Sequence, residues 1–118
     1  PERIVFAAHE MPEIASEIER KNEGRVSFRQ VGDAHKHQLQ ILFETYQPGA
    51  DTGRSMLRHE SQEGGIVISG RMELTVEDRK YILGPGDSYL FDSRLPHRFR
   101  NPFEETCTLV SACTPPYL

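Results

Sequence analysis

Two short motifs between Gly53 and Asn101 constrain the fold of this chain more than any other feature. The first contains a histidine, a glutamate and a glycine at fixed spacing. The second contains a Gly-Pro-Gly-Asp turn, a histidine and an asparagine. In sequence order these residues are His59, Glu63 and Gly70, then Gly84–Asp87, His97 and Asn101. If the strands that carry the motifs belong to one closed sheet, two histidines and one glutamate can meet at a single point inside it.

Between the motifs lies what reads as a β-hairpin with its corner at Ser69-Gly70, where glycine can supply the positive φ of a tight turn. Other short apolar or alternating runs are separated mostly by Gly, Pro, Asp or Asn. Many short strands at regular spacing are typical of an all-β sandwich or barrel. The predicted strands are RVSFRQV, LQILFETY, SMLRH, GGIVIS, RMELTVE, KYIL, DSYLF, HRFR and TCTLVSA.

The first 24 residues follow a different pattern. RIVFAA reads as a short apolar strand or a connecting arm. The apolar residues from Met11 to Ile18 then fall at helical spacing, with Pro12 near the start and Gly24 after the end, which predicts a short amphipathic helix. We therefore divide the chain into an N-terminal arm with a short helix, residues 1–24, and a β-barrel, residues 25–118.

Length and composition limit the class of protein. A chain of 118 residues suits one domain with a single core. A net charge of −4 argues against a free-standing nucleic-acid-binding protein. No apolar run approaches the roughly 18 residues of a membrane span, and the N-terminus lacks a signal-peptide pattern. Two cysteines close together in one strand favour reduced thiols and a cytoplasmic protein. Because the first residue is Pro1 rather than Met, we expect a piece of a longer chain.

His59, Glu63 and His97 are the candidate metal ligands. Imidazole nitrogen and carboxylate oxygen suit zinc and divalent iron, nickel or manganese, and two histidines with one carboxylate form the set used by non-haem iron oxygenases. Strand alternation places His97 on the opposite face from Arg98 and Arg100, which predicts solvent-facing arginines. The alternative is that both histidines simply line the barrel and bond to Glu63 and water.

Two other features are candidate metal ligands. Cys113 shares a strand face with Cys107, Leu109 and Ser111. A thiolate there would favour zinc, but a small buried apolar side chain is the commoner role of a free cysteine. His35-Lys36-His37 has the spacing of a ligand pair, yet no carboxylate follows it, so a polar turn is the preferred interpretation.

The two motifs resemble those of the cupin family. His59 falls on the second histidine of the first motif, and Leu57 stands where the family has the first. The resemblance implies a cupin barrel, also called a jelly-roll or double-stranded β-helix. It also implies a divalent metal site in which one usual ligand is missing.

A narrower resemblance runs from Phe43 to Leu118, through FETYQPGADTG and MLRHESQEGGIVISGRMELTV to LVSACTPPYL. These segments are similar to the cupin half of helix-turn-helix/cupin bacterial transcriptional regulators, such as repressors of putrescine utilisation. The resemblance implies a domain that binds a small-molecule effector and contacts DNA only through a domain absent from this chain. The alternative is a stand-alone metal-dependent cupin enzyme, an oxygenase, isomerase or lyase.

Ile66 and Ile68 share the face of their strand opposite to Glu63, and we expect both to point outward. Exposed isoleucines need cover, and regulators of this type bind two-fold operators, so a homodimer is predicted. Glu44, Glu63 and the tyrosines are compatible with the acidic or aromatic walls that a polyamine effector would need.

Overall fold

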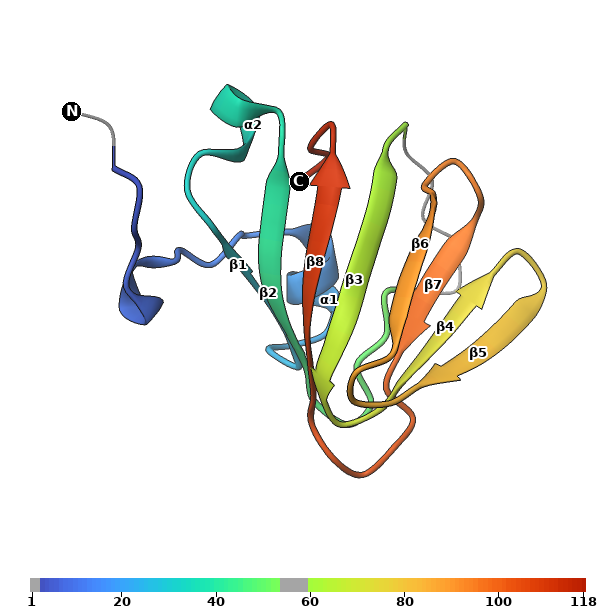
Figure 1. The fold of residues 1–118 in the computed structure, drawn as a ribbon. Coiled ribbons are helices and arrows are strands. Elements are labelled where there is room, and N and C mark those ends of the chain that lie inside the picture. Colours follow the sequence, from blue (N-terminus) through green and yellow to red (C-terminus); the bar gives the residue numbers. More distant parts are fainter. Residues whose placement is uncertain (1–2, 54–59) are drawn as a thin grey trace.

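The computed structural model describes residues 3–53 and 60–118 as a two-layer β-sandwich (Figure 1). A five-stranded sheet has the order β1-β2-β8-β3-β6 and a three-stranded sheet the order β5-β4-β7, with every pairing antiparallel. The all-β prediction is confirmed. The strands are β1 (Val26–Gln30), β2 (Gln40–Tyr46), β3 (Gln62–Ser69), β4 (Met72–Val76), β5 (Arg79–Leu83), β6 (Ser88–Asp92), β7 (His97–Arg100) and β8 (Cys107–Thr114). The predicted strand SMLRH, residues 55–59, lies outside the described residues.

The N-terminal arm contains less helix than its periodicity predicts. A 3-10 turn, η1 (Ala8–Glu10), precedes α1 (Glu17–Lys21), which begins after Ser16. The residues before α1 instead pair with the edge strand β1: the Ile14 amide donates to the Phe28 carbonyl at 2.8 Å, and the Gln30 amide donates to the Pro12 carbonyl at 3.0 Å. An edge strand offers unpaired backbone groups, and these bonds replace the first helical turn.

The chain turns at Ser69-Gly70 as predicted, but the prediction that the two flanking strands form a hairpin is wrong. β3 pairs with β6 and β8 in one sheet, and β4 pairs with β5 and β7 in the other. The chain therefore crosses between the layers at Gly70, which has φ +74°. A Cβ atom at this position would lie 2.1 Å from the Thr106 carbonyl oxygen, so only glycine fits where the two layers meet.

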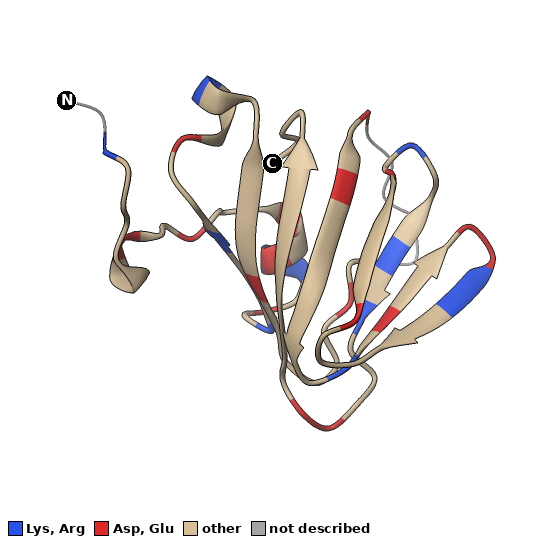
Figure 2. Cartoon of the chain, viewed as in Figure 1, with Lys and Arg blue, Asp and Glu red and all other residues tan. Residues whose placement is uncertain are grey.

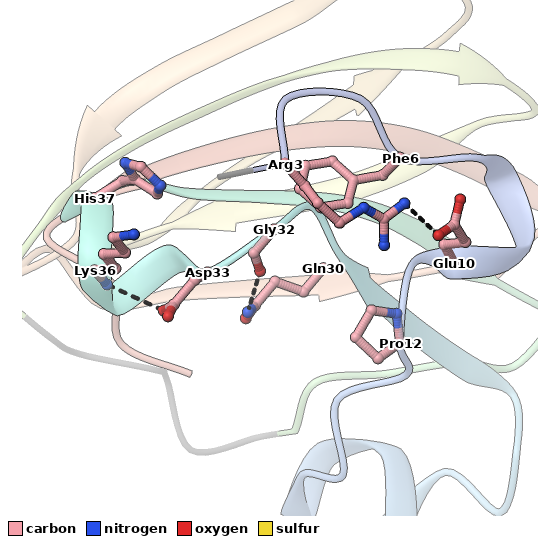
Figure 3. Close-up of a pocket in the computed structure, with 9 residues that line it drawn as sticks. All are labelled: Arg3, Phe6, Glu10, Pro12, Gln30, Gly32, Asp33, Lys36 and His37. Atoms are coloured by element: carbon pink, nitrogen blue, oxygen red, sulfur yellow. Dashed lines mark hydrogen bonds and ion pairs between the residues drawn. The ribbon is translucent and has the colours of Figure 1, made fainter. Parts of the chain in front are cut away.

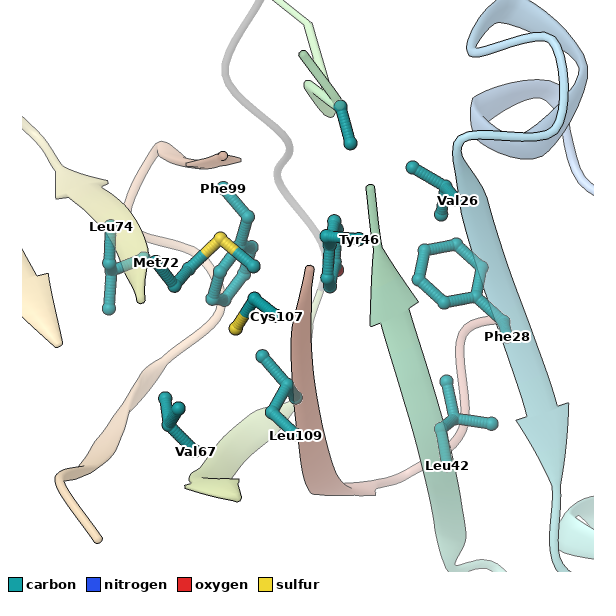
Figure 4. Close-up of a cluster of buried hydrophobic side chains, with 11 residues drawn as sticks. Val26, Phe28, Leu42, Tyr46, Val67, Met72, Leu74, Phe99, Cys107 and Leu109 are labelled. Atoms are coloured by element: carbon teal, nitrogen blue, oxygen red, sulfur yellow. The ribbon is translucent and has the colours of Figure 1, made fainter. Parts of the chain in front are cut away.

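The apolar core fills the space between the two sheets (Figure 4). Met72 and Leu74 of β4 and Phe99 of β7 face Leu109 and Tyr46 of the five-stranded sheet. On β8 the predicted alternation is confirmed, because Cys107, Leu109, Ser111 and Cys113 are all buried. The boundary predicted at residue 24 between arm and barrel stays a prediction.

Both cysteines are free thiols, as expected. Burial raises the pKa of each thiol to about 11, so both stay protonated near neutral pH. The Cys113 thiol donates to the Pro115 carbonyl at 3.4 Å. Since the thiolate is the metal-binding form, this environment favours the small buried side chain over the ligand. In the part of the chain that the structure describes, no helix is long and apolar enough to cross a membrane.

Candidate functional site

The fold brings Glu63 and His97 together from opposite layers. His97 Nε2 on β7 lies 3.0 Å from Glu63 Oε1 on β3, and their exposed fractions are 0% and 4%. The Ser93 hydroxyl donates to the same Glu63 oxygen at 3.1 Å. The third predicted ligand, His59, and the substituted position Leu57 lie outside the described residues. Two of the three predicted ligands therefore meet, and the third stays a prediction.

The tautomer of His97 follows from its second contact. Nδ1 lies 2.8 Å from the Leu95 carbonyl oxygen, which can only accept, so Nδ1 carries the proton and donates. Burial lowers the pKa of His97, but the hydrogen bonds to Glu63 and Leu95 outweigh this effect, and the pKa is raised overall. A backbone carbonyl that orients an imidazole is the usual support for a metal-ligating histidine.

Within residues 3–53 and 60–118, no three His, Cys, Asp or Glu side chains converge as a metal site requires. The arginines that flank His97 face away from this pair, as alternation predicts. Arg98 forms an ion pair with Asp51, and Arg100 Nη2 lies 3.2 Å from Glu73 Oε2. These arginines are thus committed to the outer surface and are not ligand clamps.

A second carboxyl group, Glu44 on β2, is buried in the same interior, with 6% of its surface exposed. The Tyr46 and Ser111 hydroxyls donate to its two oxygens. Burial raises the pKa of Glu44 to about 7, while the hydrogen bonds from Ser111 and Tyr46 oppose this and the charge of Glu63 adds to it. Near neutral pH, Glu44 is therefore poised between its neutral and charged forms.

The interior holds more carboxyl groups than basic side chains. Of the described acidic and basic side chains, the buried ones are Glu44, Glu63 and His97, and no lysine or arginine is among them. Aromatic rings stand around these groups: Phe91 lies edge-on to His97 with the centroids 4.8 Å apart, and Tyr89 and Phe99 have centroids 5.4 Å apart. Buried carboxyl groups in an interior that also holds aromatic rings suit a small organic cation.

The His35-Lys36-His37 segment forms α2 (Ala34–His37), a single helical turn, in agreement with the polar-turn interpretation. Its last two residues line a surface pocket of about 460 Å³ between the N-terminal arm and β1 (Figure 3). Arg3 in this pocket pairs with Glu10, and the Asp33 side chain accepts from the Lys36 amide. These interactions fix the arm and cap α2, so the pocket is explained by packing.

Glu44 is the site residue that the metal-centred interpretation left out of the predicted ligand set. The signal was in the strand LQILFETY, where Leu42, Glu44 and Tyr46 share a face. Since Leu42 and Tyr46 are large and apolar or aromatic, their burial places Glu44 inside as well. Its hydroxyl partner Ser111 is 67 residues away in sequence, and no local pattern predicts that contact.

Comparison with known proteins identifies related sequences and folds. Residues 42–113 match the family model described as Cupin_2, a cupin domain. The HTH-type transcriptional regulator PuuR of Escherichia coli (strain K12) is 37% identical over 99 residues, which cover 83% of this chain and 52% of that protein. The chain thus spans about half the length of this curated relative. An uncharacterised protein of Archaeoglobus fulgidus is 36% identical over 59 residues, 50% of this chain and 56% of its own.

Solved structures confirm the cupin fold. The Cupin_2 domain of an XRE family transcriptional regulator from Enterobacter cloacae has a TM-score of 0.70 at 21% identity, covering 79% of this chain and 99% of its own. A predicted oxalate decarboxylase from Thermotoga maritima has a TM-score of 0.78 at 16% identity, covering 96% of this chain and 100% of its own. At these identities the likeness establishes the fold alone.

The raised pKa of Glu44 predicts a pH-dependent stability. From the ordinary value of 4.5 up to about 7, the folded protein holds a proton that the unfolded chain has released. The free energy of unfolding contributed by this group therefore falls as pH rises through that interval and then levels off. Glu44→Gln stays neutral, and its amide can accept from one hydroxyl and donate to the other. It should therefore lie within about 1 kcal/mol of wild type at pH 5 and exceed it by about 3 kcal/mol at pH 8.

Urea unfolding at the two pH values measures this difference. The exposed Glu104 gives the matched control, since Glu104→Gln removes the same charge at the surface and should leave the pH profile of wild type unchanged. An unaltered pH profile in Glu44→Gln would show that the buried carboxyl is not the titrating group.

Proposed function

Because it belongs to the Cupin_2 domain family, and its relatives include a helix-turn-helix regulator, we propose that this chain is the small-molecule-sensing domain of a cytoplasmic bacterial transcriptional regulator. The similarity to PuuR along most of the chain is the observation that carries the proposal. The regulator's helix-turn-helix domain would then lie in a part of the protein outside this chain, and DNA would be bound through it.

The buried carboxyl groups support a cationic effector. Charging Glu44 inside the sandwich is unfavourable, as its raised pKa shows, and a bound cation removes that penalty. An amine of low molecular mass supplies the charge together with N–H donors for carboxylate oxygens. The effector class proposed here is therefore a small aliphatic amine, held chiefly by Glu44 with Glu63 close by.

This proposal predicts that amine binding strengthens with pH. Aliphatic amines stay protonated at pH 6 and pH 8, whereas Glu44 changes from mostly neutral to mostly charged between them. Affinity should rise about tenfold, in proportion to the charged fraction. Calorimetric titration with a series of alkylamines and α,ω-diamines measures it, with Glu104→Gln as the control.

Glu44→Gln should weaken binding and abolish the pH dependence. Binding that is equally tight in Glu44→Gln, or that weakens as pH rises, would contradict the amine assignment. If the effector belongs to another chemical class, none of these amines should bind wild type either.

A homodimer is the second part of the proposal. Ile66 and Ile68 on β3, Val110 on β8 and Leu90 on β6 are exposed by 50%, 53%, 38% and 79% on the outer face of the five-stranded sheet. β8, at the middle of this face, carries no charge (Figure 2). The five strands are five to eight residues long and cover about 540 Å² at about 3.4 Å per residue and 4.8 Å between strands, close to the roughly 600 Å² per partner at which specific interfaces begin.

A second copy is the occupant that fits this face, since an apolar surface with no charge along its middle strand complements itself. We expect sedimentation at micromolar concentration to give twice the chain mass. Ile66→Glu should yield monomers. Ile82→Glu is the matched control, because Ile82 is 54% exposed on β5 of the other sheet and should leave the dimer intact. Monomeric wild type, or dimers of Ile66→Glu, would refute this interface.

A divalent metal is the third part. Glu63 and His97 fit metal binding, because the Leu95 carbonyl fixes the His97 proton on Nδ1 and leaves Nε2 beside the Glu63 carboxylate. His59, Glu63 and His97 would hold the ion, which when bound would act as a Lewis acid towards an oxygen of a bound molecule. The metal, like the alternative of an oxygenase, isomerase or lyase, stays a prediction.

Because Leu57 replaces one usual ligand, we expect substoichiometric metal after purification, rising when Zn²⁺ or Ni²⁺ is added. Leu57→His should raise the occupancy. His97→Ala should abolish binding while far-ultraviolet circular dichroism stays that of wild type. Elemental analysis of the three proteins makes the comparison, and equal metal in wild type and His97→Ala would place the ion elsewhere.

A further inference from the structure

Tyr89 reaches across the interior face of the five-stranded sheet. It lies on the edge strand β6, directly opposite Gly65 of β3. A Cβ atom built at Gly65 would lie 2.5 Å from the Tyr89 hydroxyl oxygen, so the aromatic side chain occupies the space that a larger residue would need. Glycine at position 65 thus allows the Tyr89 hydroxyl to extend inward. Gly65 is also paired with Ser111 of β8 on its other side.

The Tyr89 hydroxyl oxygen is buried, and it has no hydrogen-bond partner among the described residues. The nearby hydroxyls of Tyr46 and Ser111 behave differently, since both donate to Glu44. A buried hydroxyl without a partner is unfavourable in the folded protein, whereas phenylalanine would keep the same ring contacts at no such cost. Packing alone therefore does not account for a tyrosine at this position.

The ring of Tyr89 lies between an open pocket and the aromatic rings of the interior. A pocket of about 260 Å³ lies between the edge strands β5 and β6, lined by Tyr81, Leu83, Tyr89 and Phe91 with two residues of β4. On the inner side, Tyr89 packs against Phe99 with the ring centroids 5.4 Å apart. Burial raises the pKa of Tyr89 well above its ordinary value, and the charges of Glu44 and Glu63 add to this. The hydroxyl thus stays protonated and can both donate and accept.

From this geometry we infer that Tyr89 is a specificity-determining residue, whose hydroxyl binds a second polar group of the effector. This inference rests on the proposed function, in which Glu44 holds a cationic amine. A ligand with an ammonium group at one end and a hydroxyl or amino group at the other satisfies both Glu44 and Tyr89. A plain alkylamine satisfies Glu44 alone.

Two probes that differ by one hydroxyl test the contact: butylamine and 4-amino-1-butanol. Calorimetric titration should show wild type binding 4-amino-1-butanol at least tenfold more tightly than butylamine. Tyr89→Phe should bind butylamine as wild type does and lose the preference. A preference that survives in Tyr89→Phe would overturn the inference.

Thermal unfolding without ligand provides a test that does not depend on the amine. Tyr89→Phe should unfold at the same temperature as wild type or higher, because it removes a hydroxyl with no partner. Tyr46→Phe is the matched control and should unfold at a lower temperature, since it removes a hydroxyl bonded to Glu44. A lower unfolding temperature for Tyr89→Phe would show that its hydroxyl already has a partner in the free protein, and would overturn the inference.

The two measurements separate this inference from the function beneath it. If neither probe binds wild type, the amine effector is refuted. The unfolding temperatures then decide by themselves whether the Tyr89 hydroxyl lacks a hydrogen-bond partner in the free protein. If both probes bind equally in wild type, the amine effector stands and the role of Tyr89 is refuted.

Discussion

The burial of the Glu44 carboxyl group inside the sandwich is the constraint on which the rest of the site depends. A carboxylate withdrawn from water loses its hydration, and only the two hydroxyls of Tyr46 and Ser111 replace it among the described contacts. The result is a group whose charge depends on what stands beside it. Tyr46 and Ser111 lie on neighbouring strands, β2 and β8, so the carboxyl also joins β2 to the middle strand of the larger sheet.

The crossing at Gly70 has a comparable influence on the second acidic group. Since the chain leaves the five-stranded sheet there, Glu63 stays in one layer while β7 delivers His97 from the other. The Glu63–His97 contact thus joins the two sheets inside the sandwich. A hairpin at the same position would have placed β3 and β4 side by side and separated these residues.

Much of the fold follows from strand alternation, but its assembly does not. The inward positions of Glu63, His97 and Cys113 were predictable because each lies on a strand with a two-residue period. The pairing of β3 with β8 was not, because alternation gives the face of a side chain without naming the neighbouring strand. The helical period from Met11 to Ile18 misled for a similar reason: β1 offered backbone partners that the arm's own sequence does not reveal. Glu44 could be placed inside from Leu42 and Tyr46, whereas its partner Ser111 required the folded topology.

The pairing of the arm with β1 has a mechanical consequence. Glu44 lies on β2, β2 is hydrogen-bonded along its length to β1, and β1 holds the arm through the Ile14 and Pro12 backbone bonds. Backbone hydrogen bonds thus connect the strand of the interior acid with residues 12–14 of the arm. We expect a displacement of β2 to reach the arm, because no loop lies between these two sets of hydrogen bonds.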